Sequence, residues 1–216
     1  HGQSKGGTYL GSLMADAGRK KMNQFLESSE YIDWEEPSVL KKAKELSRGL
    51  SGDEAISKRC FDFVRDEIKH SHDYALNPVT VKASDVLKYG TGYCYAKSHL
   101  LAALLRANGI PAALSYQRLS LEGDGEPFCL HGLNAVKLEQ YGWYRIDARG
   151  NKAGVDAQFD PPTEKLAFSE TVQGEYSLDG LFSEPLPEVI EVLTKCQSEA
   201  EVWSHLPDVK SSAKGA

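Results

Sequence analysis

Three residues, Cys94, His131 and Asp147, have side chains that together can carry out nucleophilic chemistry. A deprotonated cysteine is a strong nucleophile, and an imidazole can accept its proton and later return it to a leaving group. A carboxylate that binds one imidazole nitrogen fixes the tautomer and leaves the other nitrogen facing the thiol. If the fold brings the three residues together, they predict acyl chemistry by a nucleophile, a base and an orienting carboxylate.

The sequence around Cys94 predicts a buried helix that begins at the cysteine. Gly90-Thr91-Gly92 interrupts the chain, and the segment after Cys94 is rich in Ala and Leu up to Asn108-Gly109 and Pro111, which are typical of a helix end. Unpaired backbone N–H groups at the first turn and the positive end of the helix dipole favour thiolate over thiol. The backbone N–H of Cys94 can also contribute to an oxyanion hole.

The second half of the chain predicts antiparallel strands that position the other two residues. Strand patterns cover residues 113–121, 128–138 and 143–147. The Gly-rich segment 122–127 predicts a loop, and Glu139-Gln140-Tyr141-Gly142 predicts a hairpin connection. His131 and Asp147 are therefore expected on paired neighbouring strands.

Helices are expected on both sides of this unit. Their signals are helical spacing over residues 9–26, Pro37 at a first turn, a capping box at Ser51-Gly52-Asp53-Glu54, a Ser84 cap, and a closing helix over 187–206. In the helix after the capping box, the inner face is expected to hold Ile56, Cys60, Phe63, Val64 and Ile68. Helices followed by antiparallel strands indicate an α+β domain. We expect an accessory helical segment at 1–50, the main domain at 51–206 and a polar tail at 207–216.

Composition limits the classes of partner. The chain has 216 residues and a formal net charge of −6, which argues against nucleic acid or an anionic membrane as the main partner. Charges or glycines interrupt every apolar run, so no membrane span is expected. The four cysteines are widely and irregularly spaced, which favours reduced thiols in a cytoplasmic protein and leaves two disulfides in an exported protein as the alternative. The first residue is His1 rather than Met, so processing or tagging leaves the location open.

The chain resembles the transglutaminase-like superfamily, which has a papain-like α+β scaffold. The resemblance is carried by Gly92-Tyr93-Cys94 with Ala96, by Leu104-Leu105-Arg106-Ala107-Asn108-Gly109-Ile110-Pro111-Ala112, by His131-Gly132-Leu133, and by Gly142-Trp143-Tyr144-Arg145-Ile146-Asp147. It covers roughly residues 56–147. The resemblance implies Cys94 as nucleophile, His131 as base and Asp147 as orienting residue. We expect a peptide or protein amide as substrate, whether a peptide bond, an isopeptide bond or a glutamine side-chain amide, and no cofactor.

Two departures from the family pattern lie near these residues. The family usually has Ala-Trp after its His and Pro soon after its Asp, whereas this chain has Gly132-Leu133 and Ala148-Arg149-Gly150. These departures bear on substrate preference more than on the roles of Cys94, His131 and Asp147. We expect hydrolysis of an amide rather than crosslinking, because the chain has no EF-hand-like run and lacks the extra domains of the large calcium-dependent enzymes. The alternatives are an inactive peptide-binding module and a small-molecule acyltransferase of arylamine-acetyltransferase type.

The roles of several neighbouring residues have two interpretations. Tyr93, Tyr95, Tyr74 and Trp143 are candidates for lining the cleft, or else aromatic residues at a core edge. Cys129 either borders the site or packs in the core, and Cys60 and Cys196 are expected to be structural. His70 and His72 alternate as on one strand face, but no C-x-x-C or H-E-x-x-H pattern accompanies them, so no metal site is expected.

Overall fold

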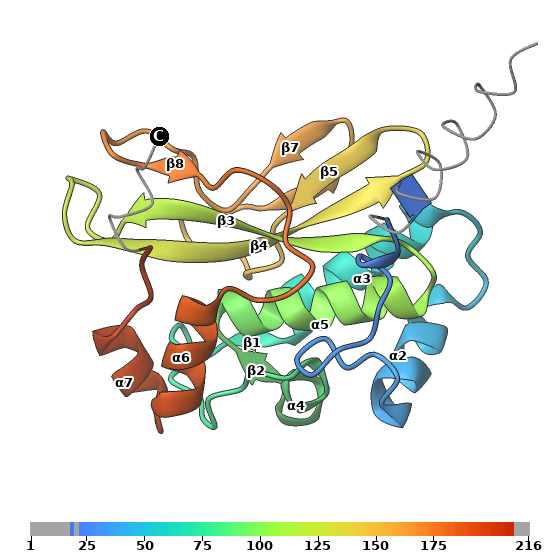
Figure 1. The fold of residues 1–216 in the computed structure, drawn as a ribbon, viewed down its shortest axis with the longest axis horizontal. Coiled ribbons are helices and arrows are strands. Elements are labelled where there is room, and N and C mark those ends of the chain that lie inside the picture. Colours follow the sequence, from blue (N-terminus) through green and yellow to red (C-terminus); the bar gives the residue numbers. More distant parts are fainter. Residues whose placement is uncertain (1–17, 20–21, 210–216) are drawn as a thin grey trace, which may run out of the picture.

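The fold places one antiparallel sheet against a group of helices. The computed structural model describes residues 18–19 and 22–209, and Figure 1 shows the sheet on one side and the helices on the other. The main sheet has the order β5-β4-β3-β8. Its strands are β3 (Ala112–Ser120), β4 (Phe128–Leu138), β5 (Gly142–Ile146) and β8 (Tyr176–Ser177). The expected α+β class is confirmed, and the three long strands lie within a residue of their predicted bounds.

Helix α5 (Cys94–Ala107) is the centre of the core, beneath β3 and β4 in Figure 1. Every residue from Cys94 to Arg106 is buried, because apolar side chains surround the helix on all sides. The helix is followed by Gly109, whose φ of +74° suits glycine, and then by Pro111. The buried guanidinium of Arg106 donates to the carbonyls of Ala112, Glu27 and Ser183, so its polar atoms are satisfied.

Further helices and two small sheets complete the described part of the fold. The helices are α2 (Pro37–Ser47), α3 (Asp53–Glu67), α4 (Ala83–Tyr89), α6 (Pro187–Lys195) and α7 (Glu199–Ser204). Two small sheets pair β1 (Lys69–His70) with β2 (Thr91–Gly92) in parallel and β6 (Gln158–Asp160) with β7 (Thr163–Lys165) in antiparallel. Ile32 and Val39 share one core with Cys94, so the described part of segment 1–50 packs into the main domain. The predicted helical spacing before residue 18 lies outside the described residues.

Three local predictions need correction. The capping box is wrong, because Gly52 rather than Ser51 is the N-cap of α3 and the Asp53 carboxylate accepts the backbone N–H of Glu139. Ser84 does not cap α4, since its hydroxyl donates to Asp33 instead. The inner face of α3 is rotated from the expected one: it buries Ser57 and Phe61, whereas Ile56 and Phe63 are half-buried.

The closing helix is also interrupted. Helix α6 ends at Lys195, and Cys196 is extended. Ser198 then starts α7 by accepting the backbone N–H of Glu201 through its hydroxyl. Beyond α7 the chain follows the main sheet. The carbonyl of Pro207 accepts the N–H of Leu130, and Asp208 forms an ion pair with Arg118. This break allows the last described residues to dock beside β4.

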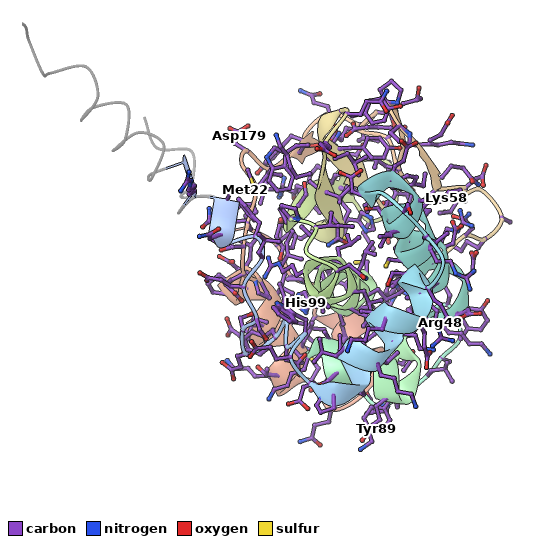
Figure 2. The ribbon with its side chains drawn as sticks, turned by 90° about the vertical axis from the view of Figure 1, so that its right-hand side faces the viewer. Met22, Arg48, Lys58, Tyr89, His99 and Asp179 are labelled. Carbon is purple, nitrogen blue, oxygen red and sulfur yellow. The ribbon has the colours of Figure 1, made fainter. Side chains whose placement is uncertain are left out.

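The interior of the described part holds a fully buried histidine. In Figure 2 His99 lies inside the molecule, whereas Arg48, Lys58 and Asp179 lie at its outside. Burial lowers the pKa of His99 to about 4, so the ring is neutral near pH 7. No helix within residues 18–19 and 22–209 is long and apolar enough to span a lipid bilayer.

Candidate active site

A cleft of about 620 Å³ opens at the N-terminal end of α5 and contains Cys94 and His131. Its polar and ionisable lining includes His70, Tyr93, Tyr95 and Arg149, and its apolar lining includes Leu119, Leu121, Phe168, Val172 and Trp203. A larger hollow of about 770 Å³ lies among α2, α3 and α4, but it holds none of the three predicted residues. The chemistry suggested by the sequence therefore concentrates in the smaller cleft.

His131 and Asp147 form a buried pair. The Nε2 atom of His131 lies 2.8 Å from Oδ2 of Asp147, and the two side chains are 6% and 0% exposed. The carboxylate also accepts the backbone N–H groups of Ala167 and Arg149, at 3.0 and 3.2 Å. Because Asp147 occupies Nε2, Nδ1 is the imidazole nitrogen left for exchanging a proton with a second group.

Cys94 lies at an open edge of strand β4. Strand β5 pairs with β4 only as far as Ile146 opposite Asn134, so β5 does not cover the edge of β4 before that point. The backbone N–H of Gly132 points out of this edge and donates to Sγ of Cys94 at 3.4 Å. The end of β5 therefore leaves room for the thiol beside the residue that follows His131.

The charges around His131 favour its protonated form. Burial lowers the pKa of His131, but the carboxylate of Asp147 and the nearby Cys94 sulfur outweigh it and raise that pKa to about 10. Burial raises the pKa of Asp147, while the His131 charge and the hydrogen bonds to the carboxylate lower it by more. An imidazolium held between a carboxylate and a thiol can stabilise a thiolate and can deliver a proton to a leaving group.

This order of residues matches a known family. The sequence pattern of the transglutaminase-like superfamily matches residues 41–148, which is half of the chain. The chain belongs to the transglutaminase-like superfamily. The match contains α5, β3, β4 and β5, and it ends directly after Asp147.

Solved structures of similar proteins were also found. A provisionally named cysteine protease from Cytophaga hutchinsonii is 20% identical, with 60% of this chain and 42% of that chain covered and a TM-score of 0.47. The periplasmic domain of TgpA from Pseudomonas aeruginosa is 20% identical, with 57% and 45% covered and a TM-score of 0.41. A provisionally named protease from Parabacteroides distasonis is 12% identical, with 77% and 30% covered and a TM-score of 0.42.

This superfamily member spans less than half the length of each of those three chains. No curated protein matches it.

The other predicted residues divide into two groups. Tyr93 and Tyr95 do line the cleft, with their hydroxyls donating to the carbonyls of Glu199 at 2.7 Å and Leu130 at 2.5 Å. Tyr74 and Trp143 do not. Tyr74 is exposed beside Lys69, and Trp143 packs edge-on against Phe25 at 5.0 Å. The expectation that these two residues line the cleft is therefore corrected.

The three further cysteines lie in surroundings that disfavour a thiolate. Burial raises the pKa of Cys60 and of Cys129 to about 12 in each case, and it also raises the pKa of Cys196. Cys129 lines the same cleft as Cys94, so it borders the site, whereas Cys60 lies in the core. All four thiols are free.

Sequence reasoning missed several residues at the cleft. Phe168 packs edge-on against the His131 ring at 5.0 Å. Arg149 forms a bidentate ion pair with Asp73, at 2.7 and 2.9 Å. It stands in the segment after Asp147 where the chain departs from the family pattern, and this departure is a signal in the sequence. Trp203 stacks on His72 at 3.7 Å and has no comparable signal in the sequence. Among residues 18–19 and 22–209, no group of three or more His, Cys, Asp or Glu side chains is placed to hold a metal ion.

Lys97 is a buried lysine one turn after Cys94. Its ammonium donates to the carbonyls of Ile68, at 2.5 Å, and Arg65, at 3.5 Å. These carbonyls lie at the C-terminal end of α3, where the negative end of the helix dipole favours a cation. Burial nevertheless lowers the pKa of Lys97 to about 7. Lys97 thus joins α5 to α3 with a charge that is lost near neutral pH.

Proposed function

We propose that this protein is a cysteine hydrolase that cleaves an amide bond of a peptide or protein through a thioester on Cys94. The observation that carries the proposal is the placement of Cys94 Sγ on the N–H of Gly132, directly beside the buried His131–Asp147 pair. A thiol, an imidazole and an orienting carboxylate meet there at the start of a buried helix.

The reaction has two halves. The Cys94 thiolate attacks the amide carbonyl, so a C–S bond forms and the carbonyl electron pair moves to oxygen. When this intermediate collapses, the C–N bond breaks and the leaving nitrogen takes the proton of the His131 imidazolium. His131 then removes a proton from water, the hydroxide adds to the thioester, and the C–S bond breaks to release a carboxylic acid and regenerate the thiolate–imidazolium pair.

Two features of the cleft support hydrolysis of a peptide. Its apolar lining, with Leu119, Phe168 and Val172, suits an apolar side chain next to the reacting amide. Its rim contains exposed residues such as Lys152 and Ser169, which let water reach the thioester. Transfer to an amine needs a site that excludes water, so water is the favoured acceptor.

The test compares wild type with Cys94→Ala on a panel of fluorogenic peptide amides and glutamine-containing peptides, with ammonia release as a second readout. We expect turnover by wild type and its loss in Cys94→Ala. Cys196→Ala is the matched control, because Cys196 lies outside the cleft. Equal turnover by Cys94→Ala and wild type would refute the nucleophile assignment. Peptide binding without turnover by wild type would indicate a binding module instead.

A further inference from the structure

His70 is fixed beside the start of the nucleophile helix. It pairs with Gly92 across the parallel strands β1 and β2, and the N–H of Ser71 donates to the carbonyl of Gly92 at 3.0 Å. Gly92 lies two residues before Cys94. The His70 ring packs edge-on against Tyr93 at 5.2 Å and lines the same cleft as Cys94 and His131. Backbone pairing and ring packing therefore set the orientation of this imidazole.

The tautomer of His70 follows from its hydrogen bond. Its Nδ1 atom accepts the backbone N–H of His72 at 3.2 Å, so Nδ1 carries no proton. Asp73 Oδ1 is 3.9 Å from Nδ1, and its carboxylate is held by Arg149 and Lys152. Burial and the charge of Arg149 lower the pKa of His70 well below its usual range, so the ring is neutral. A neutral ring without a proton on Nδ1 has its proton on Nε2.

The Nε2–H of His70 is an uncommitted donor. None of the described residues accepts a hydrogen bond from it. Nε2 is not among the described side-chain atoms that are fully buried without a partner, and the His70 side chain lines the cleft. Nearby polar groups are already engaged. The hydroxyls of Tyr93 and Tyr95 donate to backbone carbonyls, and Arg149 is held by Asp73. The cleft that contains Cys94 thus has a neutral, oriented N–H donor in its lining.

We infer that His70 is the second donor of the oxyanion hole, with its Nε2–H and the backbone N–H of Cys94 binding the carbonyl oxygen as it becomes negative. Cys94 is the first residue of α5, so its N–H has no partner within the helix. When the thiolate attacks, the C–S bond forms and the carbonyl electron pair moves to the oxygen between these two donors; no proton leaves His70. The inference rests on the proposed function, because it assigns a role in that same reaction.

The test uses two variants of the full chain. His70→Phe keeps a flat ring but removes the donor, and His70→Gln retains an amide that can accept the His72 N–H and donate into the cleft. Loss of one oxyanion donor is expected to lower kcat by about 10²- to 10³-fold with little change in KM, and Gln is expected to restore part of the loss. His205→Phe is the matched control, because His205 is exposed outside the cleft, and it is expected to keep the wild-type kcat.

A second readout separates this role from a structural one. Alkylation of Cys94 by iodoacetamide forms no oxyanion, so its rate is expected to be the same in His70→Phe and wild type. Equal kcat in His70→Phe and wild type would overturn the inference while leaving the proposed function intact. Parallel loss of kcat and alkylation in both variants would also overturn it, because His70 would then act only on the shape of the site. Absence of turnover by wild type would instead refute the proposed function.

Discussion

Gly132 and Tyr95 occupy complementary space at the contact between β4 and α5. A Cβ atom at position 132 would lie 3.1 Å from both Cα and the ring atom Cδ1 of Tyr95, and 3.3 Å from its backbone N. Two of these three atoms belong to the backbone, so they cannot rotate away. The same glycine donates its N–H to Cys94. A Cβ at this position, as in the alanine that the family usually has after its histidine, would therefore have to displace the backbone at Tyr95.

Gly132→Ala tests this relationship. The added methyl group is expected to push the first turn of α5 away from β4, at a cost of about 1–3 kcal/mol in the free energy of unfolding. Because that turn carries Cys94, alkylation of the thiol by iodoacetamide is expected to slow as well. Thermal unfolding and the alkylation rate measure the two effects. Gly18→Ala is the control, since a Cβ there meets nothing within 4 Å. Wild-type values for both measurements in Gly132→Ala would disprove the steric argument.

Asp147→Asn tests the orienting carboxylate. The amide carries no negative charge to stabilise the His131 imidazolium. Its NH₂ group would also face a backbone N–H that now donates to the carboxylate. We expect kcat to fall by about 10²- to 10⁴-fold. We also expect the free energy of unfolding to fall by about 1–3 kcal/mol. Asp156→Asn, at an exposed aspartate, is the control for both measurements. An unchanged kcat in Asp147→Asn would remove this residue from the mechanism.

The pKa of His131 predicts the alkaline side of the activity profile. The folded pKa is about 10, against an ordinary value of 6.5, so the imidazolium persists through neutral pH and is lost as pH rises through about 10. In the proposed mechanism the imidazolium supplies the proton to the leaving nitrogen, so kcat is expected to fall there. A kcat profile from about pH 6 to pH 11 measures this limb. In Asp147→Asn the residual activity is expected to fall at lower pH, because the Asp147 charge raises the His131 pKa. An alkaline limb at the same pH in both proteins would contradict the assignment.

Lys97 predicts a pH dependence of stability. Its folded pKa of about 7 lies below the ordinary 10.5, so between these values the unfolded chain holds a proton that the folded chain has released. The contribution of Lys97 to the free energy of unfolding therefore rises with pH between about 7 and 10.5. Lys97→Met removes the rise, and the variant is expected to lose stability relative to wild type by up to about 1.4 kcal/mol per pH unit. Urea unfolding at several pH values measures the difference, and parallel curves for the two proteins would count against it.

The sequence predicts the parts of the site that lie on elements with a periodic apolar pattern or next to glycines that interrupt one. The glycines before Cys94, the apolar helix and the strand–hairpin–strand segment led to Cys94, His131 and Asp147, which the structure brings together. The α+β class followed from the same patterns. The burial of apolar residues along the long helix and strands determines these features, and the spacing of apolar residues in the sequence predicts it.

The errors occurred where a contact depends on distant segments. Trp143 lies four residues before Asp147, and four residues along a strand amount to about 13 Å. There it packs against Phe25, from a distant part of the chain. The sequence shows His70 only as one of two alternating histidines, because a two-residue strand leaves no periodic signal. The pairing of β1 with β2, which the sequence does not encode as a pattern, gives His70 its place beside Cys94.

The most direct test of the central claim is to trap the acyl group on the enzyme. Wild type mixed with a turned-over peptide amide and quenched in acid is digested and mapped by mass spectrometry. The account predicts the acyl mass on the peptide that contains Cys94, removable by neutral hydroxylamine as a thioester is, and absent in Cys94→Ala. An acyl group on another residue, or continued turnover by Cys94→Ala, would contradict it.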